Sequence, residues 1–157
     1  MSVFTASEAL EMALEIEKSG EVFYNEAAAQ SDDPELKELF VSLAAQERGH
    51  YRAFQKMLEG VAPGPPLDDA DFAGYAEYVQ TALEQALFAG PDKALSLAKQ
   101  ATDRESALRA ALGFEKDTLL FFYDLRDIVS EPDREIVTHI IREEKRHLRS
   151  LARLLRG

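Results

Sequence analysis

Two Glu-x-x-His tetrads are the residues of this chain most able to do chemistry. Glu47 stands three residues before His50, and Glu144 stands three residues before His147. Because residues three apart lie on the same face of an α-helix, each tetrad can direct a carboxylate and an imidazole at one point. Such ligands suit iron or manganese, and a chain without cysteine has no thiolate to offer structural zinc. The tetrads therefore predict metal binding.

One helical glutamate precedes each tetrad at nearly the same distance. Glu17 lies 30 residues before Glu47, and Glu115 lies 29 residues before Glu144. We expect the tetrad glutamates to bridge two metal ions, and each upstream glutamate to bind one ion together with the histidine of its own half. Without cations, four buried carboxylates would repel one another, so metal should also stabilise the fold. The predicted ligands are Glu17, Glu47, His50, Glu115, Glu144 and His147.

The alternative is that these charges lie on solvated helix surfaces. Two of the three histidines belong to a tetrad, and each tetrad has a matched upstream glutamate, which favours the metal centre. The third histidine, His139, has no glutamate three residues before it. It lies five residues before Glu144, on a different face of the helix, and we expect it at the surface.

The segments that carry these residues are predicted to be helices. Apolar residues recur at three- and four-residue steps among many alanines, leucines and glutamates. Capping boxes are expected at Thr5 and at Thr102, each closed by a glutamate three residues later. Turns at 31–34 and 130–133 place a proline in the first turn of the next helix. The predicted helices are 5–30, 34–59, 102–129 and 131–156, with one or two more within 67–101.

The two halves of the chain are similar to each other. A shift of 98 residues places Glu17 on Glu115, and a shift of 97 places Glu47 on Glu144. Each half is then a helical hairpin with a short turn, and the long segment between the hairpins must cross the length of the bundle. We predict one all-α domain over residues 1–157, a four-helix bundle with one long crossover. Its parts are a hairpin at 5–59, the crossover at 60–101 and a hairpin at 102–156.

Composition narrows the classes of function. The chain has 157 residues, enough for one domain with a real core. Its net charge of −11 disfavours nucleic acid as a partner. The longest apolar run, near Leu119, is far too short for a membrane span, and the first residues do not look like a signal peptide. We therefore expect a cytoplasmic protein that binds neither nucleic acid nor membrane.

The chain resembles the rubrerythrin branch of the ferritin-like superfamily, over roughly residues 8–59 and 103–155. Besides the two tetrads, the motifs are Glu17 followed seven residues later by Tyr24, and Glu115 followed eight residues later by Tyr123. The resemblance implies a ferritin-like bundle in which the six glutamates and histidines take the family's iron ligands. It also implies that the hydroxyls of Tyr24 and Tyr123 each hold a carboxylate across the bundle.

The chain departs from typical rubrerythrins at two points. Those proteins carry a further glutamate three residues after the third-helix ligand, where this chain has Thr118. In the relatives that carboxylate takes part in a shift of one iron between redox states, so the shift is in doubt here. The cysteine-ligated rubredoxin domain is also missing. Electrons would therefore come from a separate donor protein or a small reductant.

The resemblance implies a non-haem di-iron oxidoreductase that reduces hydrogen peroxide or dioxygen, of the peroxidase or ferroxidase type, with a role under oxidative stress. Two iron ions per chain are expected, with manganese or a mixed pair as alternatives. A second hypothesis is a metal-binding or metal-sensing protein without turnover. A third is a di-iron oxygenase, which would need a substrate channel beside Thr118. Fold alone does not choose among these.

The sequence also predicts two stripes of similar side chains, one basic and one apolar, each on one face of a helix. For the basic stripe, on the last helix, we expect salt bridges to acidic neighbours, and docking of an acidic electron donor is the alternative. An apolar stripe in the crossover is expected to pack on the bundle, or to bury against a second subunit in a homodimer. The basic stripe is Arg142, Arg146, Arg149, Arg153 and Arg156, and the apolar one is Tyr75, Tyr78, Val79, Ala82 and Ala86.

Overall fold

The computed structural model describes residues 6–61 and 90–157, and every regular element in these ranges is an α-helix. The all-α prediction is therefore confirmed. The helices are α1 (Ala6–Gln30), α2 (Pro34–Glu59), α4 (Pro91–Gln100), α5 (Arg104–Ile128) and α6 (Glu131–Arg156).

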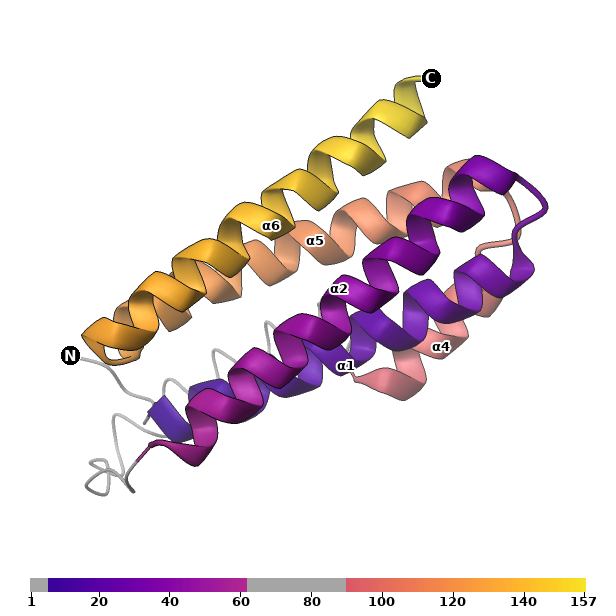
Figure 1. Ribbon diagram of the computed structural model, residues 1–157. Coiled ribbons are helices and arrows are strands. Elements are labelled where there is room, and N and C mark those ends of the chain that lie inside the picture. The colour runs from indigo at the N-terminus through magenta and orange to yellow at the C-terminus, as the bar shows by residue number, and fades with distance from the viewer. Residues whose placement is uncertain (1–5, 62–89) are drawn as a thin grey trace.

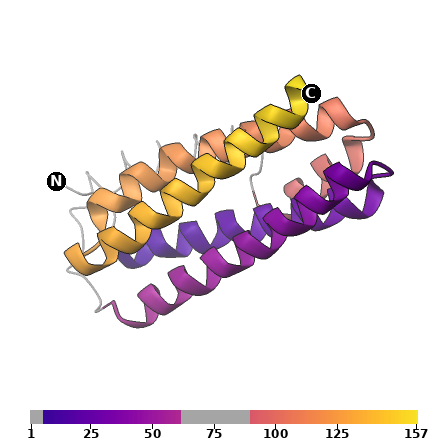
Figure 2. The ribbon, with the colours of Figure 1, turned by 45° about the horizontal axis from the view of Figure 1, so that its top comes forward.

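The four long helices form a bundle of two hairpins (Figure 1). Helix α1 packs on α2 and α5 packs on α6, while α1–α5 and α2–α6 contacts join the hairpins. Both views show the pairs side by side (Figure 2). Helix α2 ends and α5 begins at opposite ends of the bundle (Figure 1), which is consistent with the predicted long crossover. None of the described helices has the length and apolar character needed to cross a membrane.

Local capping sets where the helices begin. The side chain of Asp33 accepts hydrogen bonds from the backbone of Glu35 at 3.0 Å and of Leu36, and caps α2 ahead of its first-turn proline. The predicted cap of the third long helix at Thr102 is wrong by one residue. Asp103 is the cap, because its carboxylate accepts from the Ser106 backbone at 2.7 Å in a capping box that excludes Thr102.

Two predicted features lie outside the described residues and stay predictions. These are the cap at Thr5 and the apolar stripe from Tyr75 to Ala86, on which the expectation of a homodimer rests. The described part of the crossover does contain one of the extra helices, α4, which packs on α1.

Two apolar clusters fill the bundle, one toward each end. The first surrounds Phe40 and includes Phe23, Leu43 and Phe114, near the α1–α2 turn. The second surrounds Phe54 and Phe122, whose ring centroids are 5.1 Å apart, near the α5–α6 turn. Along the sequence of each long helix, the predicted ligand or ligands fall between residues of the two clusters. The fold therefore holds its buried charges in a middle layer between two water-excluding layers.

Gly20 lets the helices approach closely beside that layer. A Cβ at this position would come within 2.8 Å of the Phe114 ring and 3.3 Å of the Glu47 carboxyl carbon. Any larger residue would have to displace one of them, since atoms of a packed core cannot approach so closely. Glycine here gives the Glu47 side chain its space.

Candidate metal centre

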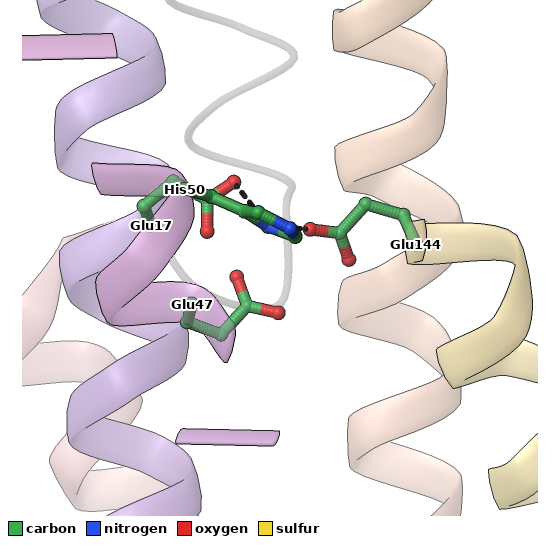
Figure 3. A group of neighbouring side chains, drawn as sticks. All are labelled: Glu17, Glu47, His50 and Glu144. Atoms are coloured by element: carbon green, nitrogen blue, oxygen red, sulfur yellow. Dashed lines mark hydrogen bonds and ion pairs between the residues drawn. The ribbon is translucent and has the colours of Figure 1, made fainter. Parts of the chain in front are cut away.

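All six predicted ligands are buried, and they meet in the middle of the bundle. The four glutamates are 0% exposed, His50 is 5% exposed and His147 is 2% exposed. Each long helix contributes: α1 carries Glu17, α5 carries Glu115, and α2 and α6 carry one tetrad each. Side chains from both hairpins point toward one another across the bundle (Figure 3).

The ligand atoms fall into two overlapping groups. Among the described residues, two groups of four side chains can be formed. In each group, one ligand atom from every side chain lies within 4.8 Å of the other three. Glu47 and Glu144 belong to both groups, which is the arrangement that two ions bridged by these carboxylates would require. The groups are Glu17, Glu47, His50 and Glu144, and Glu47, Glu115, Glu144 and His147.

Both histidines direct Nδ1 at the carboxylates. His50 Nδ1 lies 2.8 Å from Glu144 and 3.6 Å from Glu17. His147 Nδ1 lies 3.1 Å from Glu144, and 3.3 Å from both Glu115 and Glu47. The two rings are nearly parallel, with centroids 5.9 Å apart. The imidazoles therefore face one common cluster from its two sides.

The carboxylates have more oxygens than the protein satisfies. Within the described part of the chain, both oxygens of Glu17, both of Glu47, and Oε2 of Glu115 are buried without a hydrogen-bond partner. A buried acceptor without a partner costs about 1–3 kcal/mol, and more when it is charged. A pair of divalent cations would satisfy these oxygens and offset the four carboxylate charges. The donor set thus fits a metal centre.

Electrostatics in the protein without metal reflects this crowding. Burial, then the charge of Glu47, holds the pKa of Glu17 well above its ordinary value. Burial, then the charge of Glu144, raises the pKa of Glu115 to about 8. Burial also opposes ionisation of Glu144, but hydrogen bonds from Glu115 and both histidines lower its pKa. The surroundings therefore favour the ionised form of Glu144, which lies close to both imidazoles.

The pKa values of both histidines are raised, although burial on its own lowers the pKa of a histidine. Burial alone would lower the pKa of His50, but the hydrogen bond and charge of Glu144 raise it to about 10. Burial likewise opposes the charge of His147, yet Glu115, Glu144 and Glu47 together raise its pKa to about 12. Without metal, protons on the histidines thus take the place that cations would occupy.

The two predicted tyrosines differ. The hydroxyl of Tyr24 donates to Glu115 Oε1 at 2.6 Å across the bundle, as expected. Tyr123 does not match its expected role: it is half-buried, its ring contacts the cations of Arg126 and Lys145, and its hydroxyl bonds no described residue. Helical geometry explains this. A residue seven positions after a ligand returns to the same face, whereas one eight positions after it is rotated by about 80°.

Two outer partners were not predicted from the sequence. The outer nitrogen of His50, Nε2, lies 2.5 Å from Glu143, and that of His147 lies 2.8 Å from Gln46. Both partners immediately precede a tetrad glutamate, so the repeat that aligned the tetrads could have found them. Burial opposes the charge of Glu143, but hydrogen bonds and charges of His50 and His139 lower its pKa.

Two further positions complete the surroundings. Thr118 is 1% exposed, and its hydroxyl has no hydrogen-bond partner among the described residues. The side chain of His139 is 62% exposed, which confirms its predicted place at the surface, and its Nε2 lies 2.7 Å from Glu143.

Comparison with known proteins gave one family match. A family model described as Rubrerythrin matches residues 8–155, nearly the whole chain. No curated protein and no solved structure matched.

Proposed function

This chain belongs to the rubrerythrin family, and we propose that it is a non-haem di-iron oxidoreductase that reduces hydrogen peroxide or dioxygen with electrons from outside the chain. The observation that carries the proposal is the overlap of the two ligand groups at Glu47 and Glu144. One shared pair of carboxylates would hold two ions close together, so that each could give one electron to the same oxidant.

The protein would hold the ions and keep the site dry. We propose that Glu17 and His50 bind one ion, that Glu115 and His147 bind the other, and that Glu47 and Glu144 bridge them. When bound, the iron pair would supply two electrons, one from each ion, to the oxidant. Tyr24 would fix the orientation of Glu115, and the apolar clusters on both sides would exclude water. Because each glutamate of the site would bind metal in this proposal, none is assigned as a general base.

Iron is the metal we propose, on the strength of the family. The ligand set of four carboxylates and two imidazoles also suits manganese, so a manganese or mixed pair is the alternative. Metal analysis of the protein isolated from its own host would distinguish them. We also propose that the protein works in the cytoplasm, where removal of peroxide would serve under oxidative stress.

Electrons would come from a separate donor protein or a small reductant. The basic stripe supports docking of an acidic donor, because its five arginines are exposed and none forms an ion pair in the described part of the chain. Among residues 6–61 and 90–157, the salt bridges expected as their default role are therefore not found. The stripe lies on α6, whose inner face carries His147, so a donor there would sit about one helix diameter, roughly 10 Å, from the centre.

Ferrous loading without oxygen tests the proposal. Two ferrous ions should bind per chain, and hydrogen peroxide or dioxygen should then oxidise both, as followed by ferric absorption. Comparing the two oxidants at equal concentration identifies the preferred one. Glu105→Gln, a change on the exposed surface, is the control and should behave like the wild type. Binding of fewer than two irons, or irons that stay ferrous with both oxidants, would overturn the proposal.

The docking of the donor has its own test. The reversal Arg146→Glu with Arg149→Glu should raise the KM for an acidic donor protein and leave the rate with a small reductant unchanged. An equal loss with both reductants would place the defect in the metal centre, and no loss with either would remove the stripe from electron transfer.

Metal sensing without turnover remains the second candidate. The unpartnered buried oxygens favour it, because they couple metal occupancy to the stability of the fold. A metal-dependent change in oligomeric state, with negligible consumption of peroxide under any reductant, would select this function over the first.

A further inference from the structure

The outer nitrogens of the two histidines meet chemically different partners. His50 Nε2 lies 2.5 Å from a carboxylate oxygen of Glu143, whereas His147 Nε2 lies 2.8 Å from the amide oxygen of Gln46. Each partner sits directly before the tetrad glutamate of its own half and reaches the histidine of the other half. The positions are therefore equivalent, but one carries a charge and the other is neutral.

The difference continues one helical turn away. Glu143 Oε1 pairs with Nε2 of His139, four residues earlier, at 2.7 Å. Gln46 Nε2 donates to the hydroxyl of Ser42, also four residues earlier, at 3.2 Å. The shift of 97 residues that aligns the tetrads also aligns Ser42 with His139 and Gln46 with Glu143. Two equivalent chains of contacts thus lead from the cluster to the surface, and only one of them is charged.

The outer partner of a metal-bound histidine changes how strongly the ring binds. With Nδ1 turned to the carboxylate cluster, Nε2–H remains free to donate outward. A carboxylate acceptor polarises the ring more than an amide does and makes Nδ1 the better ligand, and loss of such a partner typically costs about 10–100-fold in metal affinity. Glu143 also places a negative charge near the ion bound by His50, and Gln46 places none near the other.

We propose that Glu143 makes the two metal positions unequal, so that the ion bound by His50 is held more tightly and binds first. Glu143 is a positioning and tuning residue, because it acts through His50 and does not touch the ion. The inference rests on the proposed di-metal centre. It adds the order in which the two positions bind metal, which the ligands alone do not predict because they are nearly the same on both sides.

Three variants of the full chain test the proposal: Glu143→Gln, Gln46→Glu, and the swap that combines both. Cobalt(II) is the probe, because it binds carboxylate and imidazole and does not react with oxygen during the titration. Calorimetry gives the two stepwise dissociation constants, and the exchangeable Nε2–H signals in proton NMR, shifted by the bound ion, report which histidine is occupied. Circular dichroism of each metal-free variant checks the fold.

The wild type should bind two cobalt ions with constants at least about 10-fold apart, His50 being occupied first. Glu143→Gln should weaken the tighter step about 10-fold or more, and Gln46→Glu should strengthen the weaker one. The swap should again give two unequal steps, now with His147 occupied first. Two ions bound with constants unchanged in all three folded variants would overturn the proposal and leave the di-metal centre intact. Failure of the wild type to bind two ions would instead overturn the centre itself.

Discussion

The two hairpins of this bundle carry the same proposed metal ligands and differ in the contacts that support them. In the α5 half, Glu115 accepts a hydrogen bond from Tyr24. Its counterpart Glu17 has no hydrogen-bond partner in the described part of the chain, and the position equivalent to Tyr24 in the second half is Phe122. The support around the ligands is therefore not repeated although the ligands are.

This difference shows which features the centre needs twice. In the proposed centre, two bridged cations would need carboxylates and an imidazole on both sides, which is consistent with the repeat of these residues. The supports are contributed across the bundle: Tyr24 of α1 holds Glu115 of α5, and Glu143 of α6 holds His50 of α2. A substitution of a supporting residue in one hairpin should therefore alter the position or charge of a proposed ligand in the other hairpin. The predictions below compare the halves directly, from the largest expected effect to the smallest.

Replacing a bridging ligand should do more than replacing a terminal one. Glu144→Gln should abolish binding of both ions, because Glu144 belongs to both ligand groups. Glu17→Gln should leave one ion per chain, since Glu17 belongs to one group only. Metal content after dialysis measures both outcomes. Stabilisation by metal, about 2.7 kcal/mol at a free concentration 100 times the dissociation constant, should vanish in Glu144→Gln.

The metal-free forms of these variants supply the control. Glu17→Gln should be more stable than the wild type without metal, because it removes a buried carboxyl whose ionisation is opposed by burial and by the charge of Glu47. Equal metal loss in Glu17→Gln and Glu144→Gln would contradict the assignment of bridging and terminal roles.

Stability should depend on pH in opposite ways with and without metal. Folding raises the pKa of Glu115 from 4.5 to about 8 and that of His50 from 6.5 to about 10. The folded state therefore holds protons that the unfolded state releases, and the stability from them is full below the unfolded pKa and lost as pH rises through the folded pKa. The Tm of the metal-free protein should fall between about pH 5 and pH 10.

Metal should reverse this trend, because cations compete with the same protons. The difference in Tm between loaded and chelator-treated protein should widen between about pH 5.5 and pH 8, at about 2–4 °C for each kcal/mol in a chain of this size. The double variant Glu17→Gln with Glu115→Gln should flatten the metal-free curve. A metal-free Tm that rises across this range would refute the proton-for-metal exchange.

Two glycines on the first hairpin should respond to alanine with opposite signs. Gly20→Ala should destabilise the protein by about 1–3 kcal/mol, because the new Cβ meets the Phe114 ring at 2.8 Å and crowds Glu47. Gly49→Ala should stabilise it by up to about 1 kcal/mol, because Gly49 lies inside α2 with nothing within 4 Å of its added Cβ. Denaturant unfolding measures both. If Gly20→Ala instead stabilised the protein, the close approach of α1 to the Phe114 ring of α5 would not be needed for stability.

The sequence predicted the bundle and the ligand cluster because both depend on periodic patterns. Helix boundaries followed from proline and capping residues, and the six proposed ligands followed from a spacing that repeats in both halves. The cap at Thr102 was misplaced because Asp103 and Ser106 form an equally good box one residue later. A sequence pattern cannot distinguish two possible caps at neighbouring positions. In the folded chain, the cap is the residue whose side chain reaches a free backbone N–H at the start of the helix.

The outer contacts were harder to predict because they cross between hairpins. Glu143 and Gln46 are ordinary polar residues of a helix until the packing places them against the histidines of the other half. The expectation for Tyr123 was wrong because a spacing of eight was treated like a spacing of seven. Gly20 carries no pattern at all, since its role depends on the distance between α1 and α5.

The smallest expected effect on stability comes from removing the hydroxyl of a tyrosine, and it should differ between Tyr24 and Tyr123. Tyr24→Phe should cost the metal-loaded protein about 1 kcal/mol, because it removes the hydroxyl that donates to Glu115 at 2.6 Å. Tyr123→Phe should change the free energy of unfolding by less than about 0.5 kcal/mol, because its hydroxyl bonds no described residue. Denaturant unfolding at a fixed excess of metal compares them. Equal costs would give Tyr123 a role that its contacts do not show, whereas a cost confined to Tyr24 would establish that Glu115 depends on the opposite hairpin.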